Sequence, residues 1–372
     1  MMIFKKDLPV VNSHNEWDKL EEIIIGAGFP ETIPADDITF KLFFHDNVYG
    51  HKDVSFSEPW AVDKKFIDCH KEDVESFVDL LKSHNITVVR PKVPESLTLI
   101  KTPAWRSTNY PALNVRDLTL IIGNEIIEIP SSCRYRVFEN DYLKHIFLDY
   151  FKRGAKWTSA PRPIITDNSY DKSRIYKTSD SSMKYYEDLK NKFKSPLDCG
   201  IEIMFEAANC MRLGDKILFN APTEHERLGA RWLQEQIGSK YKVWTCEIAD
   251  NHIDSCFLPV RPGLAVVTMD VIDSLPKPLQ KWDFIKVPLK LDPDFSNEYV
   301  PIASEKIFCN FLSISPNQII CFPEYYNHLA PKLKKYNVEV IPHRLRYARL
   351  FGGGHHCLSL DIRRKSKLEN YF

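Results

Sequence analysis

Apolar runs and helix-forming segments alternate along this chain. In residues 214–246, an apolar run at 216–219 leads to Thr223, and Glu226 follows three residues later. This pair forms a capping box, which satisfies the free amides at a helix N-terminus. The pattern predicts a helix that stops at Gly238 and is followed by a second strand, KYKVWTC. We therefore expect this segment to fold as strand, helix, strand.

Four further segments repeat this order with variations. The first has an apolar run at 20–26, a helix at 72–84 and a return strand at 86–90, and the second has a run at 118–129 and a helix at 141–152. The third has a run at 264–268, a short helical turn and a return strand at 282–289. The fourth has a run at 318–322, a helix at 325–336 and a return strand at 338–341. With a C-terminal return after Cys357, we count about five related units, which predicts an α/β fold built from repeats. An ordinary open α/β sheet, in which strands and helices also alternate, is the alternative.

One segment interrupts this pattern without dividing the chain. Residues 161–196 are rich in Ser, Lys, Asp and Tyr, and we expect an exposed excursion there with a short helix near 183–193. Because the same order of elements resumes beyond it, the whole chain, 1–372, is expected to form a single domain.

Composition and charge narrow the classes of function. Lys plus Arg (50) balance Asp plus Glu (50), so the net charge does not draw the protein to nucleic acid or to an anionic membrane. No window reaches the apolar length of a membrane span, and we expect neither a secretion signal nor an organelle presequence, because residues 1–11 lack an apolar core and are short. Nine scattered cysteines without a CxxC pair favour free thiols in a reducing compartment. We therefore expect a cytoplasmic protein without nucleic-acid or membrane partners.

Polar residues break the apolar pattern shortly before the apolar run of several units. They are Asp117, Glu206, His252 with Asp254, and Cys357. If the units are arranged around an axis, equivalent positions in each unit converge on the centre. These side chains are then expected to meet in one pocket, although they lie far apart in the chain.

Cys357 is the candidate nucleophile, and three glycines precede it in the segment GGGHHC. A run of glycines needs a reason, such as a positive φ or a close approach of the backbone to a ligand. If His252 transfers protons and Glu206 hydrogen-bonds the other imidazole nitrogen, these three residues have the arrangement typical of cysteine–histidine catalysis. The alternative is an inert buried cysteine beside a flexible turn.

Two carboxylates suggest what the site binds. His252 and Asp254 face the same side of an extended segment, and Asp117 joins them if the units converge. Carboxylates match a guanidinium group bidentately, and a bound cation also favours a thiolate. Alternatives are a strand-end surface carboxylate for Asp117, and a metal site that uses His and Cys ligands, although no characteristic ligand spacing supports metal.

Five segments lie in order along nearly the whole chain: VNSHNEWDKLEEIIIG, VRDLTLIIGNEIIEIP, FEAAN with MRLGDKILF, HIDSCF and GGGHHCLSLDIRR. Together they resemble the amidinotransferase family that includes glycine amidinotransferase and inosamine-phosphate amidinotransferase, within the guanidino-modifying superfamily. The resemblance implies a five-fold pseudosymmetric α/β propeller of ββαβ modules around a central active site.

The resemblance also implies a role for each site residue. Cys357 matches the nucleophile that carries the amidino group, His252 the proton carrier, and Glu206 the acidic residue that orients this histidine. Asp117 and Asp254 match guanidinium-binding carboxylates. Arg136 sits where arginine deiminases, by the same resemblance, place an arginine that holds the substrate carboxylate.

Departures from the family pattern bear on the acceptor. Asn209 stands where many members have a second acidic residue, and His355 replaces an aromatic residue. Asn251, Ala249 and Val271 differ from substrate-contacting positions of the glycine-using enzyme, so we expect Asn251 to contact a different acceptor. The short chain resembles bacterial secondary-metabolite members, such as those of the saxitoxin and cylindrospermopsin pathways.

The sequence therefore predicts a ping-pong transferase that moves the amidino group of L-arginine to a small primary amine other than glycine and releases L-ornithine. We expect no cofactor and no metal, and the resemblance favours a homodimer. The alternatives are an arginine deiminase or dihydrolase that uses water, glycine as the acceptor, and a non-catalytic guanidine-binding protein. All catalytic readings require the sulfur of Cys357 to lie near the imidazole of His252.

Overall fold

The computed structural model describes residues 9–34, 39, 59–93, 99–171, 195–249, 252–268, 271–288, 301–303, 307 and 309–372. Within these residues there are five three-stranded sheets and two two-stranded sheets. The three-stranded sheets have the strand orders β19-β1-β4, β7-β8-β9, β10-β11-β12, β13-β14-β15 and β16-β17-β18. The expected helix near 183–193 lies outside the described residues.

The strands of these five sheets are short. Their bounds are β1 Leu20–Ile25, β4 Thr87–Val89, β7 Thr119–Ile122, β8 Glu125–Glu128, β9 Lys156–Ser159, β10 Cys210–Leu213, β11 Lys216–Asn220, β12 Lys242–Cys246, β13 Phe257–Arg261, β14 Leu264–Val267, β15 Asp283–Lys286, β16 Leu312–Ser315, β17 Gln318–Cys321, β18 Glu339–Pro342 and β19 Ser359–Arg364. The two-stranded sheets pair β2 (Thr32–Ile33) with β3 (Trp60–Ala61), and β5 (Leu99–Lys101) with β6 (Arg106–Thr108).

The same connection recurs in each three-stranded sheet. The middle strand pairs antiparallel with one neighbour and parallel with the other. A parallel neighbour requires a crossover, and a helix usually supplies it. The crossovers are α2 (Lys64–Ser83), α3 (Lys144–Lys152), α5 (Glu224–Ile237) and α6 (Pro323–Lys334), and the fourth sheet uses the short 3-10 turns Ile272–Ser274 and Leu279–Lys281. None of the described helices is both long enough and apolar enough to span a lipid bilayer.

The unit predicted from residues 214–246 is confirmed in detail. Thr223 caps α5, and both hydrogen bonds of the capping box with Glu226 are present. The helix ends at Gly238, where φ is 64°. β12 then returns parallel to β11, with Lys216 opposite Lys242 and Asn220 opposite Cys246.

The structure adds strands that the apolar pattern did not predict. The run at 118–129 is a hairpin of β7 and β8 that turns at Gly123, where φ is 58°. Three other units begin with an additional strand, which is β10, β13 or β16. These strands are antiparallel hairpin partners of four or five residues, which are too short to give a clear periodicity in the sequence.

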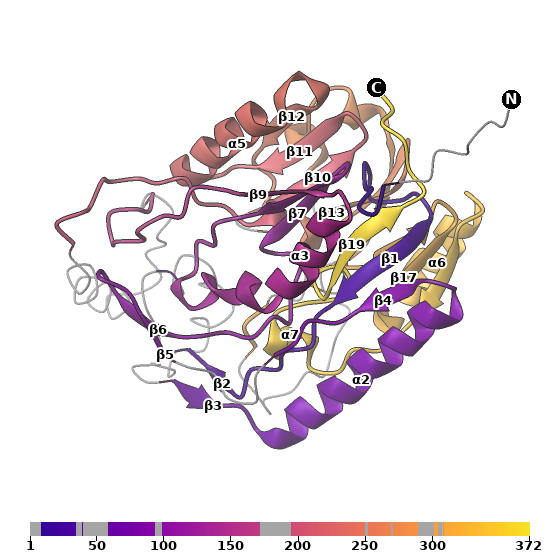
Figure 1. Cartoon of the computed structure of the whole chain (residues 1–372). Coiled ribbons are helices and arrows are strands. Elements are labelled where there is room, and N and C mark those ends of the chain that lie inside the picture. The colour runs from indigo at the N-terminus through magenta and orange to yellow at the C-terminus, as the bar shows by residue number, and fades with distance from the viewer. Residues whose placement is uncertain are drawn as a thin grey trace, which may run out of the picture.

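The two ends of the described chain meet in one sheet. β19 pairs antiparallel with β1, with Ser359 opposite Ile25 and Arg364 opposite Leu20. Figure 1 shows the yellow C-terminal strand beside the indigo N-terminal strand, with α2 along the edge of the molecule. Cys357, two residues before β19, is therefore held by the pairing of distant ends.

A network of buried charges includes two residues of β19, Asp361 and Arg364. Asp361 accepts hydrogen bonds from Arg116 at 2.6 Å, from Arg212 at 2.7 and 2.8 Å, and from Arg364 at 2.6 Å. Glu16 is the second carboxylate and accepts from Arg212 at 2.6 and 2.8 Å. Each charge is thus compensated by several partners, as a buried ion requires.

Loss of Arg212 is expected to destabilise the fold strongly. The Arg212→Met variant leaves Glu16 and Asp361 with fewer positive partners in a buried site, and breaking such a pair typically costs about 3–5 kcal/mol. The measurement is the free energy of unfolding in urea. As a control, Arg231→Ala removes an exposed ion pair with Glu235 and should cost less than about 0.5 kcal/mol. Equal losses in the two variants would contradict this account.

Candidate active site

A glycine-rich loop brings Cys357 into the interior. The short helix α7 (Ala348–Phe351) ends at Gly352, whose φ of 71° lies in the left-handed region. A Cβ on the next residue, Gly353, would lie 1.9 Å from Oδ1 of Asn114. Glycine is therefore required both for the turn and for close packing, and the loop leaves Cys357 fully buried.

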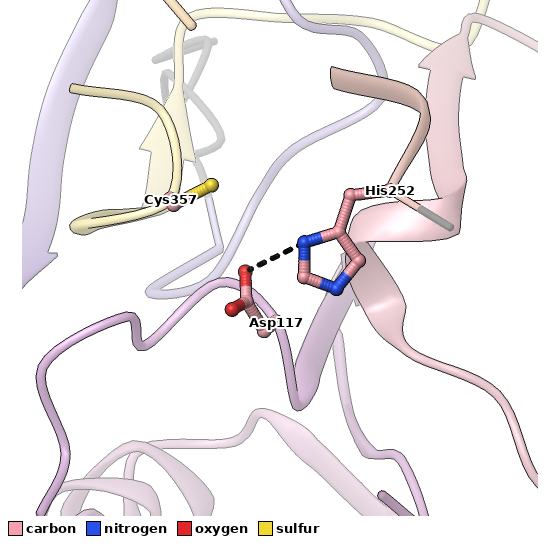
Figure 2. Close-up of side chains that lie close together, drawn as sticks. All are labelled: Asp117, His252 and Cys357. Carbon is pink, nitrogen blue, oxygen red and sulfur yellow. Dashed lines mark ion pairs between the residues drawn. The ribbon is translucent and has the colours of Figure 1, made fainter. Parts of the chain in front are cut away.

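Cys357, His252 and Asp117 meet at one point, as the sequence predicted. One ligand-type atom of each lies within 4.8 Å of those of the other two. Nδ1 of His252 is 3.9 Å from Oδ1 of Asp117. Figure 2 shows the sulfur of Cys357 directed toward the carboxylate and the imidazole. The three residues come from segments that lead into β7, β13 and β19, so the approach to three sheets positions them.

The carboxylate of Asp254 also contacts the sulfur of Cys357. The thiol of Cys357 donates to Oδ2 of Asp254 at 3.2 Å, and Nδ1 of His356 is 2.8 Å from the same oxygen. Although burial opposes it, the hydrogen bond and the charge of His356 lower the pKa of Asp254 below its ordinary value. Asp254 is therefore an anion in contact with the sulfur of Cys357.

Glu206 is held in place by the segment that follows β8. Its Oε1 accepts from Oγ of Ser131 at 3.0 Å and from N and Oγ of Ser132 at 2.9 Å. Burial raises the pKa of Glu206, while Arg136 and His252 oppose that rise. Its Oε2 has no hydrogen-bond partner among the residues that the structure describes. A direct role of Glu206 in orienting the His252 imidazole stays a prediction.

Arg136 has a different environment from the one expected. Nη1 donates to Asp117 at 2.8 Å, and Nε and Nη2 donate to Glu139 at 2.6 and 3.2 Å. Nη2 also donates to the carbonyl oxygen of Asn114 at 3.3 Å. Because the guanidinium is buried and its donors are engaged, this geometry favours a role in positioning Asp117 over the predicted role of holding a substrate carboxylate.

The sequence did not indicate two contacts near Cys357, which involve Asn310 and His356. One predicted residue also lies outside the part of the chain that the structure describes. Asn310 contacts the sulfur of Cys357, although no motif surrounds it. His356 pairs with Asp254, and nothing local in the sequence indicates this pairing. Asn251 lies outside the described residues.

The surroundings of the sulfur oppose ionisation. Burial raises the pKa of Cys357 well above its ordinary value, and the carboxylates of Asp254 and Asp117 raise it further. The thiol therefore keeps its proton in the free protein. A cation bound between these carboxylates would offset their effect and favour the thiolate.

The cluster in Figure 2 also has the residue types of a metal site. Asp, His and Cys are all zinc ligands, and these three residues are close enough to share an ion. However, Asp117 already pairs with the cation of Arg136, and the sulfur already contacts Asp254 and Asn310. The neighbouring guanidinium and these contacts favour an organic cation over a divalent metal.

Comparison with known proteins shows relatives over nearly the whole length. No protein-family model matches the chain. The chain is 32% identical over 369 residues to inosamine-phosphate amidinotransferase 1 of Streptomyces glaucescens, which covers 98% of this chain and 99% of the relative. It is 29% identical over 372 residues to L-arginine:L-lysine amidinotransferase of Pseudomonas savastanoi pv. phaseolicola, which covers 97% and 96%.

Solved structures agree with these relatives. The inosamine-phosphate amidinotransferase of Streptomyces griseus superposes with a TM-score of 0.82 at 31% identity, covering 98% of this chain and 99% of that chain. An amidinotransferase of the saxitoxin biosynthetic pathway from Microseira wollei superposes with a TM-score of 0.79 at 29% identity, covering 98% and 100%. Dimethylarginine dimethylaminohydrolase, at 14% identity and a TM-score of 0.52 over 92% and 99%, shares the propeller-like α/β fold alone. The chain therefore belongs to the amidinotransferase family, whose members are enzymes that transfer amidino groups.

Proposed function

We propose that this enzyme transfers the amidino group of L-arginine to a primary amine other than glycine, through a covalent amidino-cysteine at Cys357, and releases L-ornithine. The observation that carries the proposal is the convergence of Cys357, His252 and Asp117 within 4.8 Å. We further propose that residues 1–372 form one domain, with the five three-stranded sheets arranged around this site.

Two buried carboxylate oxygens support guanidinium binding. Oδ1 of Asp117 and Oδ1 of Asp254 have no hydrogen-bond partner among the described residues, yet both are buried. A buried acceptor without a donor is unfavourable, and the cost is larger for a charged group. The planar guanidinium of arginine offers several N–H donors and a positive charge, so it satisfies both oxygens.

In the first half-reaction, the bound guanidinium favours loss of the thiol proton, which passes to His252. The sulfur of Cys357 then forms a bond to the guanidinium carbon. The bond from this carbon to the bridging nitrogen breaks, and His252 returns the proton to that nitrogen. The products are neutral ornithine amine and a positively charged thiouronium on Cys357.

The second half-reaction is the reverse with a different amine. The acceptor nitrogen bonds to the thiouronium carbon, and the carbon–sulfur bond breaks. The proton lost by the acceptor passes through His252 to the sulfur, which restores the thiol. Differences at Ala249 and Val271 support an acceptor other than glycine, and water in place of the amine would make the enzyme a hydrolase.

Arginine alone is expected to load Cys357 with one amidino group. The measurement is the intact mass of the protein and of the peptide that contains Cys357, with ornithine assayed in parallel. Cys357→Ser removes the nucleophile and should give no adduct and no ornithine. Citrulline or ammonia formed at full rate without an amine would select the hydrolase, and arginine binding without turnover would select a non-catalytic protein.

Removing the charge of Asp117 is expected to separate its two effects. Because Asp117 raises the pKa of Cys357, the thiol of Asp117→Asn should ionise at lower pH in the free enzyme. Arginine binding should weaken by about 10- to 100-fold, as for a lost hydrogen bond to a charged group. The pH dependence of thiolate absorbance and the KM for arginine measure these effects. Asp141→Asn, at an exposed carboxylate, is the control and should change neither.

Chelation distinguishes the metal alternative. Prolonged dialysis against EDTA should leave the rate of transfer from arginine unchanged, because His252 and Cys357 act on the substrate directly. Loss of activity on dialysis, with recovery on addition of Zn²⁺, would instead assign the cluster of Asp117, His252 and Cys357 to a metal ion.

A further inference from the structure

The side-chain amide of Asn310 forms hydrogen bonds to Cys357 through both its oxygen and its nitrogen. Its Oδ1 accepts a hydrogen bond from the backbone N–H of Cys357 at 2.9 Å, and its Nδ2 donates to the sulfur at 3.2 Å. The backbone N–H of His356 donates to the carbonyl oxygen of Asn310 at 3.3 Å. One residue therefore holds the backbone and the reacting atom together.

The packing around Asn310 leaves this side chain little freedom. Asn310 is fully buried, and its N–H donates to the carbonyl oxygen of Ile307 at 3.0 Å. A Cβ on Gly354 would lie 2.7 Å from the Cβ of Asn310 and 2.8 Å from its Oδ1. The glycine of the nucleophile loop is therefore needed for the loop to reach Asn310.

Two side chains meet the sulfur at the same distance but favour opposite protonation states. Oδ2 of Asp254 is 3.2 Å away and is an acceptor, so it requires the thiol proton. Nδ2 of Asn310, also 3.2 Å away, is a donor, and a donor binds a thiolate more strongly than a thiol. The hydrogen bond from Asn310 therefore strengthens as the sulfur becomes negative.

We propose that Asn310 is a catalytic residue that orients the sulfur of Cys357 and stabilises its thiolate in both half-reactions. The inference rests on the proposed transfer reaction for the steps in which the thiolate acts. In the first step, Asn310 holds the attacking thiolate. In the second step, it receives the thiolate that leaves when the carbon–sulfur bond breaks. No proton is transferred to or from Asn310 in either step.

Two variants separate the donor from the rest of the side chain. Asn310→Asp keeps an oxygen for the N–H of Cys357 but replaces the donor by a carboxylate, whereas Asn310→Ala removes the donor without adding charge. Asn140→Asp is the matched control, since Asn140 is also a buried asparagine with both ends bonded, to Thr119 and to the carbonyl oxygen of Leu118. Each variant is first compared with the parent by thermal unfolding.

The readouts are the thiolate absorbance against pH, with the Cys357→Ser protein subtracted, and the single-turnover rate of amidino loading from arginine. In both Asn310 variants, we expect the thiol to ionise at higher pH. We also expect loading to slow by about 10- to 100-fold at saturating arginine, with less than about a threefold change in KM, as for a lost hydrogen bond to a charged group. The control should show neither change.

The inference is overturned if folded Asn310→Ala ionises and loads like the parent, or if its loss lies in KM alone. If neither Asn310 variant folds, the native enzyme labelled with 15N-asparagine decides. One side-chain amide signal should move as Cys357 ionises, and the absence of any such movement would overturn the inference. The thiol readouts need no turnover, so a failure of arginine to load the parent enzyme would refute the proposed function separately.

Discussion

Negative charge around a buried sulfur governs the chemistry of this site. Cys357 has no exposure to solvent, and Asp254 and Asp117 both oppose its ionisation. These same carboxylates have oxygens that lack a hydrogen-bond donor among the described residues. The carboxylates that keep the proton on the thiol are thus the same groups that have unsatisfied acceptors for a cation. In the proposed reaction, binding of the guanidinium and ionisation of Cys357 are therefore one electrostatic event.

This arrangement depends on the buried charges behind it. Nε2 of His356 lies 3.6 Å from Glu16, while its Nδ1 contacts Asp254. Glu16 in turn pairs with Arg212, which also pairs with Asp361. His356 therefore lies between Asp254, which contacts the sulfur of Cys357, and the buried ion network of Glu16, Arg212 and Asp361. Asp254 is thus held by contacts with both His356 and the thiol of Cys357.

Backbone contacts hold the separate segments of the site at a fixed spacing. The N–H of Arg116 donates to the carbonyl oxygen of Cys357 at 3.2 Å, and the N–H of Ala207 donates to that of Asp117 at 2.5 Å. Nε of Arg116 also donates to the carbonyl oxygen of His356 at 2.9 Å. The residues that precede three different sheets are therefore bonded directly to each other. A displacement of one sheet would therefore strain the hydrogen bonds that hold Cys357. These bonds favour a rigid site.

Local physical chemistry in the sequence determined the α5 unit, because the capping box of Thr223 and Glu226 and the stop at Gly238 act within a few residues. It also indicated Cys357, His252, Asp254 and Asp117, since polar residues at the start of apolar runs are conspicuous. Tertiary structure alone decided the partners of those residues. Asn310 lies 47 residues from Cys357, and Asp254 lies 102 residues from His356. The resemblance predicts that Arg136 holds the substrate carboxylate, but in the structure it donates to Asp117 and Glu139. The choice among these carboxylates depends on distances that no local sequence pattern contains.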